Sequence, residues 1–207
     1  MKLIIGTRGS ALAMWQARHV AGLLSKIDSS MDVELKIIKT QGDKILDAPL
    51  AKIGGKGLFT KEIEDALLEG TIDLAVHSMK DVPTEMPQGL VLGAILKRED
   101  PRDVFISRDS RSINELAPGE KVGTSSLRRR AFLLHRFPEL EVVSIRGNVD
   151  TRVKKIESEN LAGALLAAAG IIRMGYANRI KHFMGLDDMI PAIGQGAIGV
   201  QIRQDDK

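Results

Sequence analysis

The stretch KLIIGTRGSALAMWQARHVAGLLSKI, residues 2–27, sets the pattern that the rest of this chain follows. An apolar run ends at Thr7, a polar turn follows it, and a helical pattern then extends from Leu12 to Ile27. The same alternation recurs along the chain, and strands that alternate with helices predict an α/β fold with mostly parallel sheets covered on both faces. The expected strands are residues 2–7, 33–40, 72–78, 104–107, 121–124, 142–145 and 164–167, and the expected helices are residues 12–27, 58–68, 127–137 and 149–157.

The length of 207 residues suits one large domain or two smaller ones, and we expect two. The charged segment KREDPRD, residues 97–103, contains a proline and has the composition of a crossing between domains. The segment PAIGQGAIGV, residues 191–200, is interpreted as a turn that returns the chain to the first sheet, with Gln195 near the hinge. The expected domains are residues 1–97 together with 197–207, and residues 98–196.

Composition excludes several classes of protein. Hydrophobic residues make up 43% of the chain and charged residues 28%, a mixture typical of a folded soluble protein. The first apolar run is too short for a signal peptide, and no run approaches the ~18 residues of a membrane span, so a cytoplasmic protein without a membrane partner is expected. The absence of cysteine excludes disulfides, thiolate metal sites and covalent chemistry at sulfur. No metal site is expected.

Positive charge is concentrated in one window of the sequence. Residues 121–155 contain nine Lys or Arg against three acids, whereas the whole chain has a net charge of only +3. Such a concentration indicates an anionic partner, which could be a nucleic acid, a phosphate or a small molecule rich in carboxylates.

Polar segments follow the expected strands at their carboxyl ends, where ligands bind in open α/β sheets. These segments are TRGS, HSMKD, GTSSLRRR and SIRGNVDTR. If the sheets form as expected, their side chains converge from two domains on one interdomain cleft. The residues are Arg8, Ser10, Lys80, Asp81, Thr124, Ser126, Arg128, Arg129, Arg146 and Arg152.

HSMKDVP is the most specific of these segments. Pro83 stops a helix, so Lys80 and Asp81 must lie in a turn at the sheet edge. A carboxylate among many cations stays ionised and can stabilise a positive charge that develops on a substrate. The alternative is a solvated turn in which Asp81 bonds its own backbone. His77, alone at the end of a strand, is expected to be structural.

The cationic segments also have plainer interpretations. Hydroxyls and free N–H groups before Arg128 favour an anion at a helix start, yet they could also be a simple cap followed by solvated arginines. The arginines at 128–130 occupy consecutive helix positions that point in different directions, so at least one should face solvent. Ser10 could likewise be only a helix cap. Lys56 lies in a long polar loop, residues 41–57, that is either a lid or a surface loop without a role.

Seven motifs, taken together and in this order, resemble the porphobilinogen deaminases, also called hydroxymethylbilane synthases. They are GTRGSALAMWQA, GGKGLFTKEIE, AVHSMKDVP, VGTSSLRRR, SIRGNVDTR, LAAAGIIRMG and PAIGQGAIG, and they extend over essentially the whole chain. The resemblance implies two doubly wound mixed-sheet domains, similar to type II periplasmic binding proteins. It also implies a monomeric transferase of tetrapyrrole and haem biosynthesis, which condenses four porphobilinogen molecules into hydroxymethylbilane and releases ammonia.

The resemblance further implies roles for individual residues. Asp81 matches the catalytic carboxylate, which contacts pyrrole N–H groups and stabilises the cation formed when ammonia leaves. The residues that match the substrate side are Arg8, Ser10, Arg146, Arg152 and Arg173. The residues that match positions holding the dipyrromethane cofactor are Lys56, Ser78, Lys80, Thr124, Ser125, Ser126, Arg128 and Arg129. Asp43 lies in the loop that matches the mobile loop of the family.

One departure from the family is serious. Its members carry a third, C-terminal domain whose cysteine forms a thioether to dipyrromethane, and this chain has no cysteine. We therefore expect this polypeptide to be a truncated form that is inactive on its own.

Two other classes of function remain open. A non-enzymatic anion-binding protein of the periplasmic receptor type would share the fold, although the missing export signal and the Asp81 turn count against it. Nucleic-acid binding is disfavoured because one Trp, one Tyr and five Phe leave little for base stacking.

Overall fold

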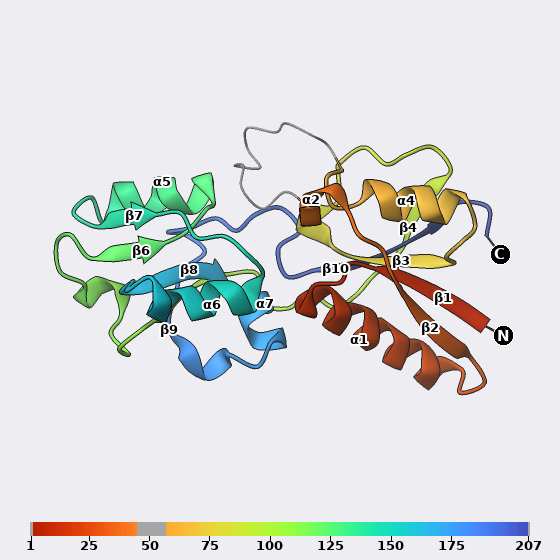
Figure 1. The fold of residues 1–207 in the computed structure, drawn as a ribbon, viewed down its shortest axis with the longest axis horizontal. Helices are drawn as coiled ribbons and strands as arrows, with labels where there is room; N and C mark the ends of the chain where they lie inside the picture. Colours follow the sequence, from red (N-terminus) through yellow and green to blue (C-terminus); the bar gives the residue numbers. More distant parts are fainter. Residues whose placement is uncertain (1, 45–56, 207) are drawn as a thin grey trace. The chain divides into compact units, whose positions relative to one another are not determined.

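The structure, a computed structural model, describes residues 2–44 and 57–206. The chain divides into two compact units (Figure 1). The first unit contains Met1–Arg98 and Ala197–Lys207, and the second contains Glu99–Gly196. Each unit is an α/β domain built on its own five-stranded sheet. None of the helices in the described residues has the length and apolar character of a membrane span.

The first unit is organised around a mixed sheet with the order β2-β1-β3-β10-β4. Its strands are β1 (Lys2–Thr7), β2 (Asp32–Ile37), β3 (Leu74–Ser78), β4 (Leu90–Ile95) and β10 (Ile198–Arg203), and its helices are α1 (Ala11–Ile27), α2 (Gln41–Lys44), α4 (Lys61–Leu68) and the 3-10 turn η1 (Met79–Asp81). Strand β1 pairs in parallel with β2 and β3, whereas β10 pairs antiparallel with β3 and β4. The end of the chain therefore completes the sheet of the first unit.

Helices α1 and α4 cover opposite faces of this sheet (Figure 1). Because side chains alternate along a strand, Leu74 and Val76 of β3 pack with Val20 of α1. The intervening Ala75 packs with Ile63 of α4 on the other face. The strand at the centre of the sheet is thus buried on both sides, which explains its continuous apolar run.

The second unit repeats this plan with the strand order β7-β6-β8-β5-β9. Its strands are β5 (Asp103–Ser107), β6 (Lys121–Gly123), β7 (Glu141–Val143), β8 (Gly163–Ala167) and β9 (Ile180–Phe183), and its helices are α5 (Leu127–Arg136), α6 (Val149–Ser158), α7 (Ala168–Arg173) and the 3-10 turns η2 (Ile113–Glu115) and η3 (Ala177–Arg179). Strand β6 is parallel to β7 and β8, and β5 is antiparallel to β8 and β9.

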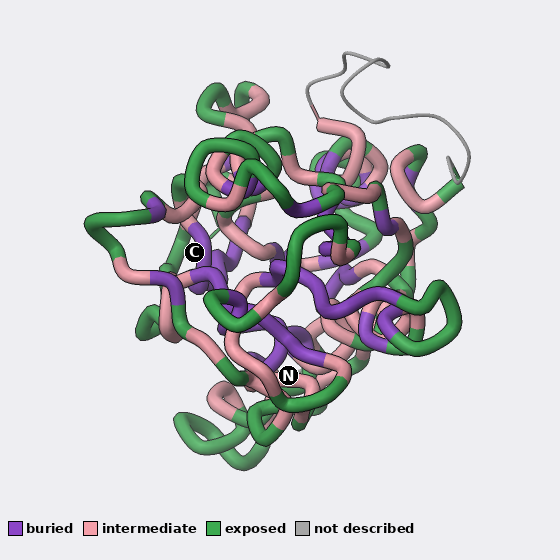
Figure 2. The backbone as a smooth tube through the Cα atoms, turned by 90° about the vertical axis from the view of Figure 1, so that its left-hand side faces the viewer, coloured by how far each residue is buried: buried purple, intermediate pink, exposed green. Residues whose placement is uncertain are grey.

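Two apolar clusters bury the faces of the second sheet. Phe105 and Leu165 pack with Leu133 of α5 on one face, and Ile106 packs with Ile156 of α6 on the other. Strands β5 and β8 approach closely at Gly163, where an added Cβ would lie 2.3 Å from the Phe105 ring. Figure 2 shows buried stretches of the chain in the interior and exposed stretches mostly in the outer turns. The core thus leaves the loops at the strand ends accessible.

The structure confirms the α/β class but corrects the expectation of mostly parallel sheets. Each sheet has two parallel and two antiparallel pairings. Apolar periodicity does not reveal strand direction, because direction depends on which distant segments become neighbours. The sequence patterns also missed α2, β4, β9 and α7, and they placed a turn where β10 begins at Ile198. Helix α7 directly follows β8 in one buried apolar run, so no change of periodicity marks its start.

Candidate functional site

Polar residues of the first unit gather where the parallel strands β1 and β3 end. Their register places Ile5 opposite Leu74, so the segments after both strands lie at the same edge of the sheet. Ser10 caps α1, and its Oγ accepts a hydrogen bond of 3.3 Å from the Ala13 N–H. Ser78 ends β3, and its Oγ accepts one of 2.8 Å from Nε2 of Gln16. Both hydroxyls thus help to hold the local backbone and helix in place.

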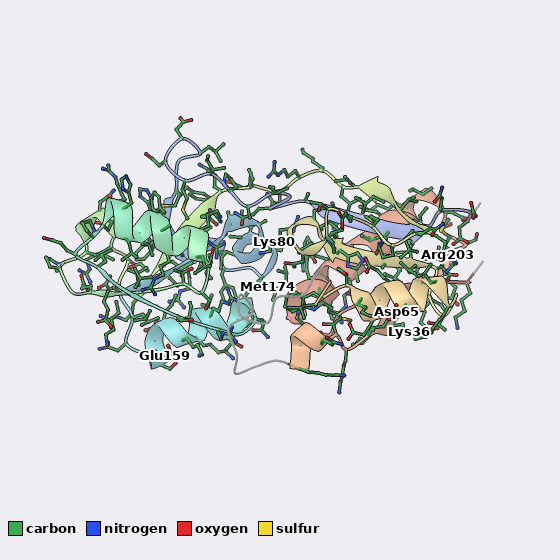
Figure 3. The ribbon with its side chains drawn as sticks, turned by 90° about the horizontal axis from the view of Figure 1, so that it is seen from above. Lys36, Asp65, Lys80, Glu159, Met174 and Arg203 are labelled. Atoms are coloured by element: carbon green, nitrogen blue, oxygen red, sulfur yellow. The ribbon has the colours of Figure 1, made fainter. Side chains whose placement is uncertain are left out.

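The turn η1 presents Lys80 and Asp81 directly after β3. The Met79 N–H donates to the Ala197 carbonyl at 3.1 Å, and the Val82 N–H closes the turn on the Met79 carbonyl. Lys80 is exposed and Asp81 is half-buried. Figure 3 labels Lys80 at one end of the first unit and Arg203 at the other. No hydrogen bond or ion pair joins the Asp81 carboxylate to any other residue that the structure describes.

Arg8, by contrast, is held by a carboxylate of its own unit. Its Nη2 lies 2.5 Å from Oδ1 of Asp43, and its guanidinium carbon lies 4.1 Å from the centre of the Phe59 ring. Partial burial alone would raise the pKa of Asp43, but hydrogen bonds from Arg8 and Thr40 hold this pKa below its ordinary value. A ligand anion would have to reach Arg8 through Nη1 or displace Asp43. The assignment of Arg8 to a substrate stays a prediction.

His77 is an interior group with its own partner. Only 5% of the residue is exposed, and its Nε2 lies 3.0 Å from Oε1 of Gln201. The Gln201 amide in turn donates to Oε1 of the buried Glu64 at 3.2 Å. Burial disfavours the imidazolium and lowers the pKa of His77 to about 4. This agrees with the expectation that His77 is structural.

In the second unit, the hydroxyls before α5 hold their own loop together. Thr124 is buried, its N–H donates to the Val143 carbonyl at 2.8 Å, and its Oγ1 accepts from the Ser126 N–H at 3.2 Å. Ser126 caps α5. Ser125 donates to the Ile145 carbonyl, which joins this loop to the one that follows β7. Any anion at these hydroxyls would have to share them with the loop.

The three arginines of α5 have different environments. Arg129 is only 6% exposed, and its Nη2 lies 2.8 Å from Oδ1 of the fully buried Asp103. Arg128 is partly exposed, and its Nη1 lies 2.5 Å from Oδ2 of the same carboxylate. Arg130 is exposed. The expectation that at least one of the three faces solvent is confirmed, because consecutive helix positions point about 100° apart.

Asp103 is the functional candidate that the sequence interpretation missed. The charge pattern places Asp103 in the crossing segment, yet it begins β5 and is buried among Arg128, Arg129 and Gln195. Its burial alone would raise the pKa of its carboxyl, but the two guanidinium groups and the Gln195 amide hold that pKa below its ordinary value. A buried acid requires a cation, and an acid at the start of the apolar strand sequence DVFIS, residues 103–107, was the available signal.

The other predicted arginines lie at or near the same edge of the second sheet. Arg146 is half-buried in the loop after β7, and Gly147 has a φ of 113°, which glycine adopts without strain. Nε of Arg152 donates to the Gly147 carbonyl at 2.8 Å. Arg173, at the end of α7, donates to the Gly196 carbonyl at 2.7 Å, and burial lowers the pKa of its guanidinium.

The structure therefore gathers one set of predicted residues in each unit. The first unit holds Arg8, Ser10, Ser78, Lys80 and Asp81, and the second holds Thr124, Ser125, Ser126, Arg128, Arg129, Arg146, Arg152 and Arg173. Lys56 lies outside the described residues. That the two sets share one cleft stays a prediction. Over residues 2–44 and 57–206, no cluster of His, Asp or Glu has the composition of a metal site.

Sequence comparisons identify close relatives. A family model described as "Porphobilinogen deaminase, dipyromethane cofactor binding domain" matches residues 3–207. Porphobilinogen deaminase of Pelobacter propionicus is 57% identical over 205 residues, which cover 99% of this chain and 66% of the relative. The enzyme named so in Geobacter metallireducens is 55% identical over 206 residues, covering 100% of this chain and 64% of the relative. The chain thus spans less than two thirds of the length of these curated relatives.

Solved structures share the fold at low sequence identity. The substrate-binding domain of a putative molybdenum ABC transporter from Clostridium difficile has a TM-score of 0.59 at 14% identity, covering 100% of this chain and 86% of that one. The methionine-binding protein MetQ has a TM-score of 0.56 at 13% identity, covering 99% of this chain and 84% of that one. These likenesses confirm two mixed-sheet α/β domains of the type II periplasmic binding protein kind.

Proposed function

The chain belongs to the porphobilinogen deaminase family, and from this premise we propose that it serves the stepwise condensation of porphobilinogen into hydroxymethylbilane. In each round the C–N bond of an aminomethyl group breaks and ammonia leaves. A new C–C bond forms to the α-carbon of a terminal pyrrole, which then loses its proton. Four rounds give a chain of four linked pyrroles. Its release takes up one water, which supplies the oxygen of the hydroxymethyl group, and the product is an intermediate on the way to haem.

One observation carries this proposal: the Asp81 carboxylate has no partner among the described residues, whereas Asp43 and Asp103 are each paired with arginine. Asp43 is bound by Arg8, and Asp103 by two arginines. Loss of ammonia leaves positive charge on the substrate, and a fixed anion aimed at that charge lowers the barrier. Asp81 is therefore proposed as the catalytic carboxylate, which accepts from pyrrole N–H groups and stabilises this charge.

The cationic side chains suit the other half of the substrate. Porphobilinogen carries one acetate and one propionate, and guanidinium groups bind carboxylates through two parallel hydrogen bonds. Support comes from position, since the cations lie at or near the carboxyl edges of strands in their own sheets. We assign the substrate carboxylates to Arg8, Ser10, Arg146, Arg152 and Arg173.

The residues of α5 and η1 suit dipyrromethane, the cofactor named in the matched family model. Its carboxylates could pair with the exposed Lys80 and with Arg128, of which Nε and Nη2 have no acceptor among the described residues. When bound, dipyrromethane supplies the pyrrole α-carbon to which the first unit is added. The remaining residues assigned to it are Ser78, Thr124, Ser125, Ser126 and Arg129, with Lys56 outside the described residues.

The absence of cysteine limits what this chain can do by itself. The 207-residue sequence offers no thiol for a thioether to the cofactor. We propose that this polypeptide binds porphobilinogen but does not turn it over.

The test is a titration of the chain with porphobilinogen, followed by calorimetry, ammonia release and absorbance of the bilane. Binding without sustained ammonia release is expected. Succinate, a dicarboxylate that lacks the pyrrole, serves as the control ligand and should bind far more weakly. Equal binding of succinate would instead favour a general anion-binding protein, and sustained bilane formation would refute the proposed inactivity.

A further inference from the structure

Asp103 joins two arginines of different exposure through the two oxygens of one buried carboxylate. Its Oδ1 accepts from Nε and Nη2 of Arg129 at 3.0 and 2.8 Å, and from Nε2 of Gln195 at 3.0 Å. Its Oδ2 accepts from Nη1 of Arg128 at 2.5 Å. Asp103 is completely buried, so it cannot itself touch a ligand.

The charges of this cluster do not cancel. The interior pair of Asp103 and Arg129 is neutral as a unit, and Nη1 of Arg129 is further occupied by the Leu165 carbonyl at 3.2 Å. Arg128 adds a second cation, and its side chain is 30% exposed. The cluster therefore presents one uncompensated positive charge, and it presents that charge at Arg128.

Both side-chain hydrogen bonds of Arg128 within the described residues are donated by the same nitrogen, Nη1. Nη1 donates to Asp103 and, at 2.8 Å, to the carbonyl of Ile190. No residue within the described ranges accepts from Nε or Nη2 of Arg128. The edge formed by Nε and Nη2 is one through which a guanidinium grips a carboxylate with two parallel hydrogen bonds. Nη1 of Arg128 is thus held in place, while the edge formed by Nε and Nη2 has no acceptor among the described residues.

From this arrangement we infer that Asp103 is a positioning residue for Arg128. It holds the guanidinium so that the edge formed by Nε and Nη2 can bind a carboxylate of the pyrrole ligand. The inference rests on the proposed function, in which Arg128 contacts a carboxylate of dipyrromethane. Porphobilinogen carries the same acetate and propionate on one pyrrole ring and serves as the probe for this position. Fixing the guanidinium before binding lowers the conformational entropy lost when the ligand arrives. Gln195 assists by holding Oδ1, which constrains the carboxylate plane and the direction of Oδ2.

A purely structural role for Asp103 would act on stability and not specifically on Arg128. A double-mutant cycle separates the two roles, because residues that act through one another are not additive. The four proteins are the wild-type chain, Asp103→Asn, Arg128→Ala and the double variant, each titrated with porphobilinogen by calorimetry.

Asp103→Asn should weaken binding on the order of tenfold, the effect of losing well-placed hydrogen bonds to a charged group. In the Arg128→Ala background the same substitution should change the dissociation constant less than twofold. An unchanged constant in the first background, or an equal loss in both, would overturn the inference. Glu120→Gln, which removes the charge of another acid paired with an arginine in this unit, is the matched control and should not alter binding.

Asp103→Asn leaves Arg129 buried without its counter-ion and could unfold the unit, so Gln195→Met provides a milder variant. It keeps every charge and removes only the hydrogen bonds of the Gln195 amide. A few-fold loss of porphobilinogen affinity is expected, again only where Arg128 is present. A loss that persists in Arg128→Ala contradicts the inference.

A measurement without ligand distinguishes failure of the inference from failure of the proposed function. The Nε–H signal of Arg128 in a ¹⁵N spectrum, assigned by its disappearance in Arg128→Ala, should report a restricted guanidinium in the wild-type chain. It should become motionally averaged in Gln195→Met. An equally restricted signal in that variant overturns the positioning role even if porphobilinogen binds. The signal could also become motionally averaged in Gln195→Met while none of the proteins binds porphobilinogen. That result would support the positioning of Arg128 and refute the proposed ligand.

Discussion

Nε2 of His77 and Oε1 of Gln201 lie 3.0 Å apart, and this contact joins β3 to a strand that begins more than a hundred residues later. The strands pair antiparallel, with Gly199 opposite His77. The imidazole is buried, and the Gln201 amide donates a further hydrogen bond to Glu64. The returning end of the chain is therefore held in the first unit by polar contacts in addition to the sheet.

This buried imidazole predicts a pH dependence of stability. The pKa of His77 is lowered from 6.5 to about 4, so between these values the unfolded chain binds a proton that the folded chain does not. Stability is then full above about pH 7 and falls as the pH drops toward 4, by up to ~3 kcal/mol. Urea unfolding at pH 7.5, 5.5 and 4.5 measures the slope. His77→Gln should reduce it, and replacing the exposed His135 by Gln should not.

Asp103→Asn should be strongly destabilising in its own right. The substitution leaves Arg129 charged in the interior, and breaking a buried pair in this way costs about 3–5 kcal/mol. Glu120→Gln breaks an ion pair that is partly exposed and should cost under about 1 kcal/mol. Chemical denaturation of both variants provides the comparison. Similar losses would show that the Asp103 cluster is more solvated than its exposure indicates.

Gly163→Ala should disrupt the second sheet. The new Cβ would lie 2.3 Å from the Phe105 ring and 2.4 Å from the Ile106 carbonyl oxygen, and the backbone cannot give way as a side chain could. Overpacking of this kind costs about 3 kcal/mol or more. Gly22→Ala is the control, because nothing lies within 4 Å of the new Cβ on helix α1. That variant should gain roughly 0.5–1 kcal/mol in unfolding free energy.

Asp81→Asn should separate binding from folding. Since no described residue pairs with this carboxylate, the unfolding free energy should change by less than about 0.5 kcal/mol. The affinity for porphobilinogen should fall about tenfold, because the amide no longer offers a negative charge to the pyrrole N–H. Asp205→Asn, near the exposed end of the chain, should leave both quantities unchanged. Retained affinity in Asp81→Asn would rule out the assigned contact.

Much of the local structure was predictable from residue patterns. The apolar run before Thr7 and the periodicity after Leu12 correspond to β1 and α1, and the polar segments fall at strand ends as expected. Strand β9 was missed because its four residues, IKHF, do not alternate between apolar and polar side chains. Strand directions were also misjudged, since they depend on neighbours that are distant in sequence.

The sequence by itself determined the α/β class, the family motifs and the absence of a cysteine for thioether chemistry. Only the tertiary structure decided which charged groups have partners. Asp43, Asp81 and Asp103 are equivalent as letters, yet one is paired with Arg8, one has no described partner and one is buried between two arginines. The reason is physical: backbone preferences act over a few residues, whereas ion pairing and burial depend on side chains brought together from distant parts of the chain.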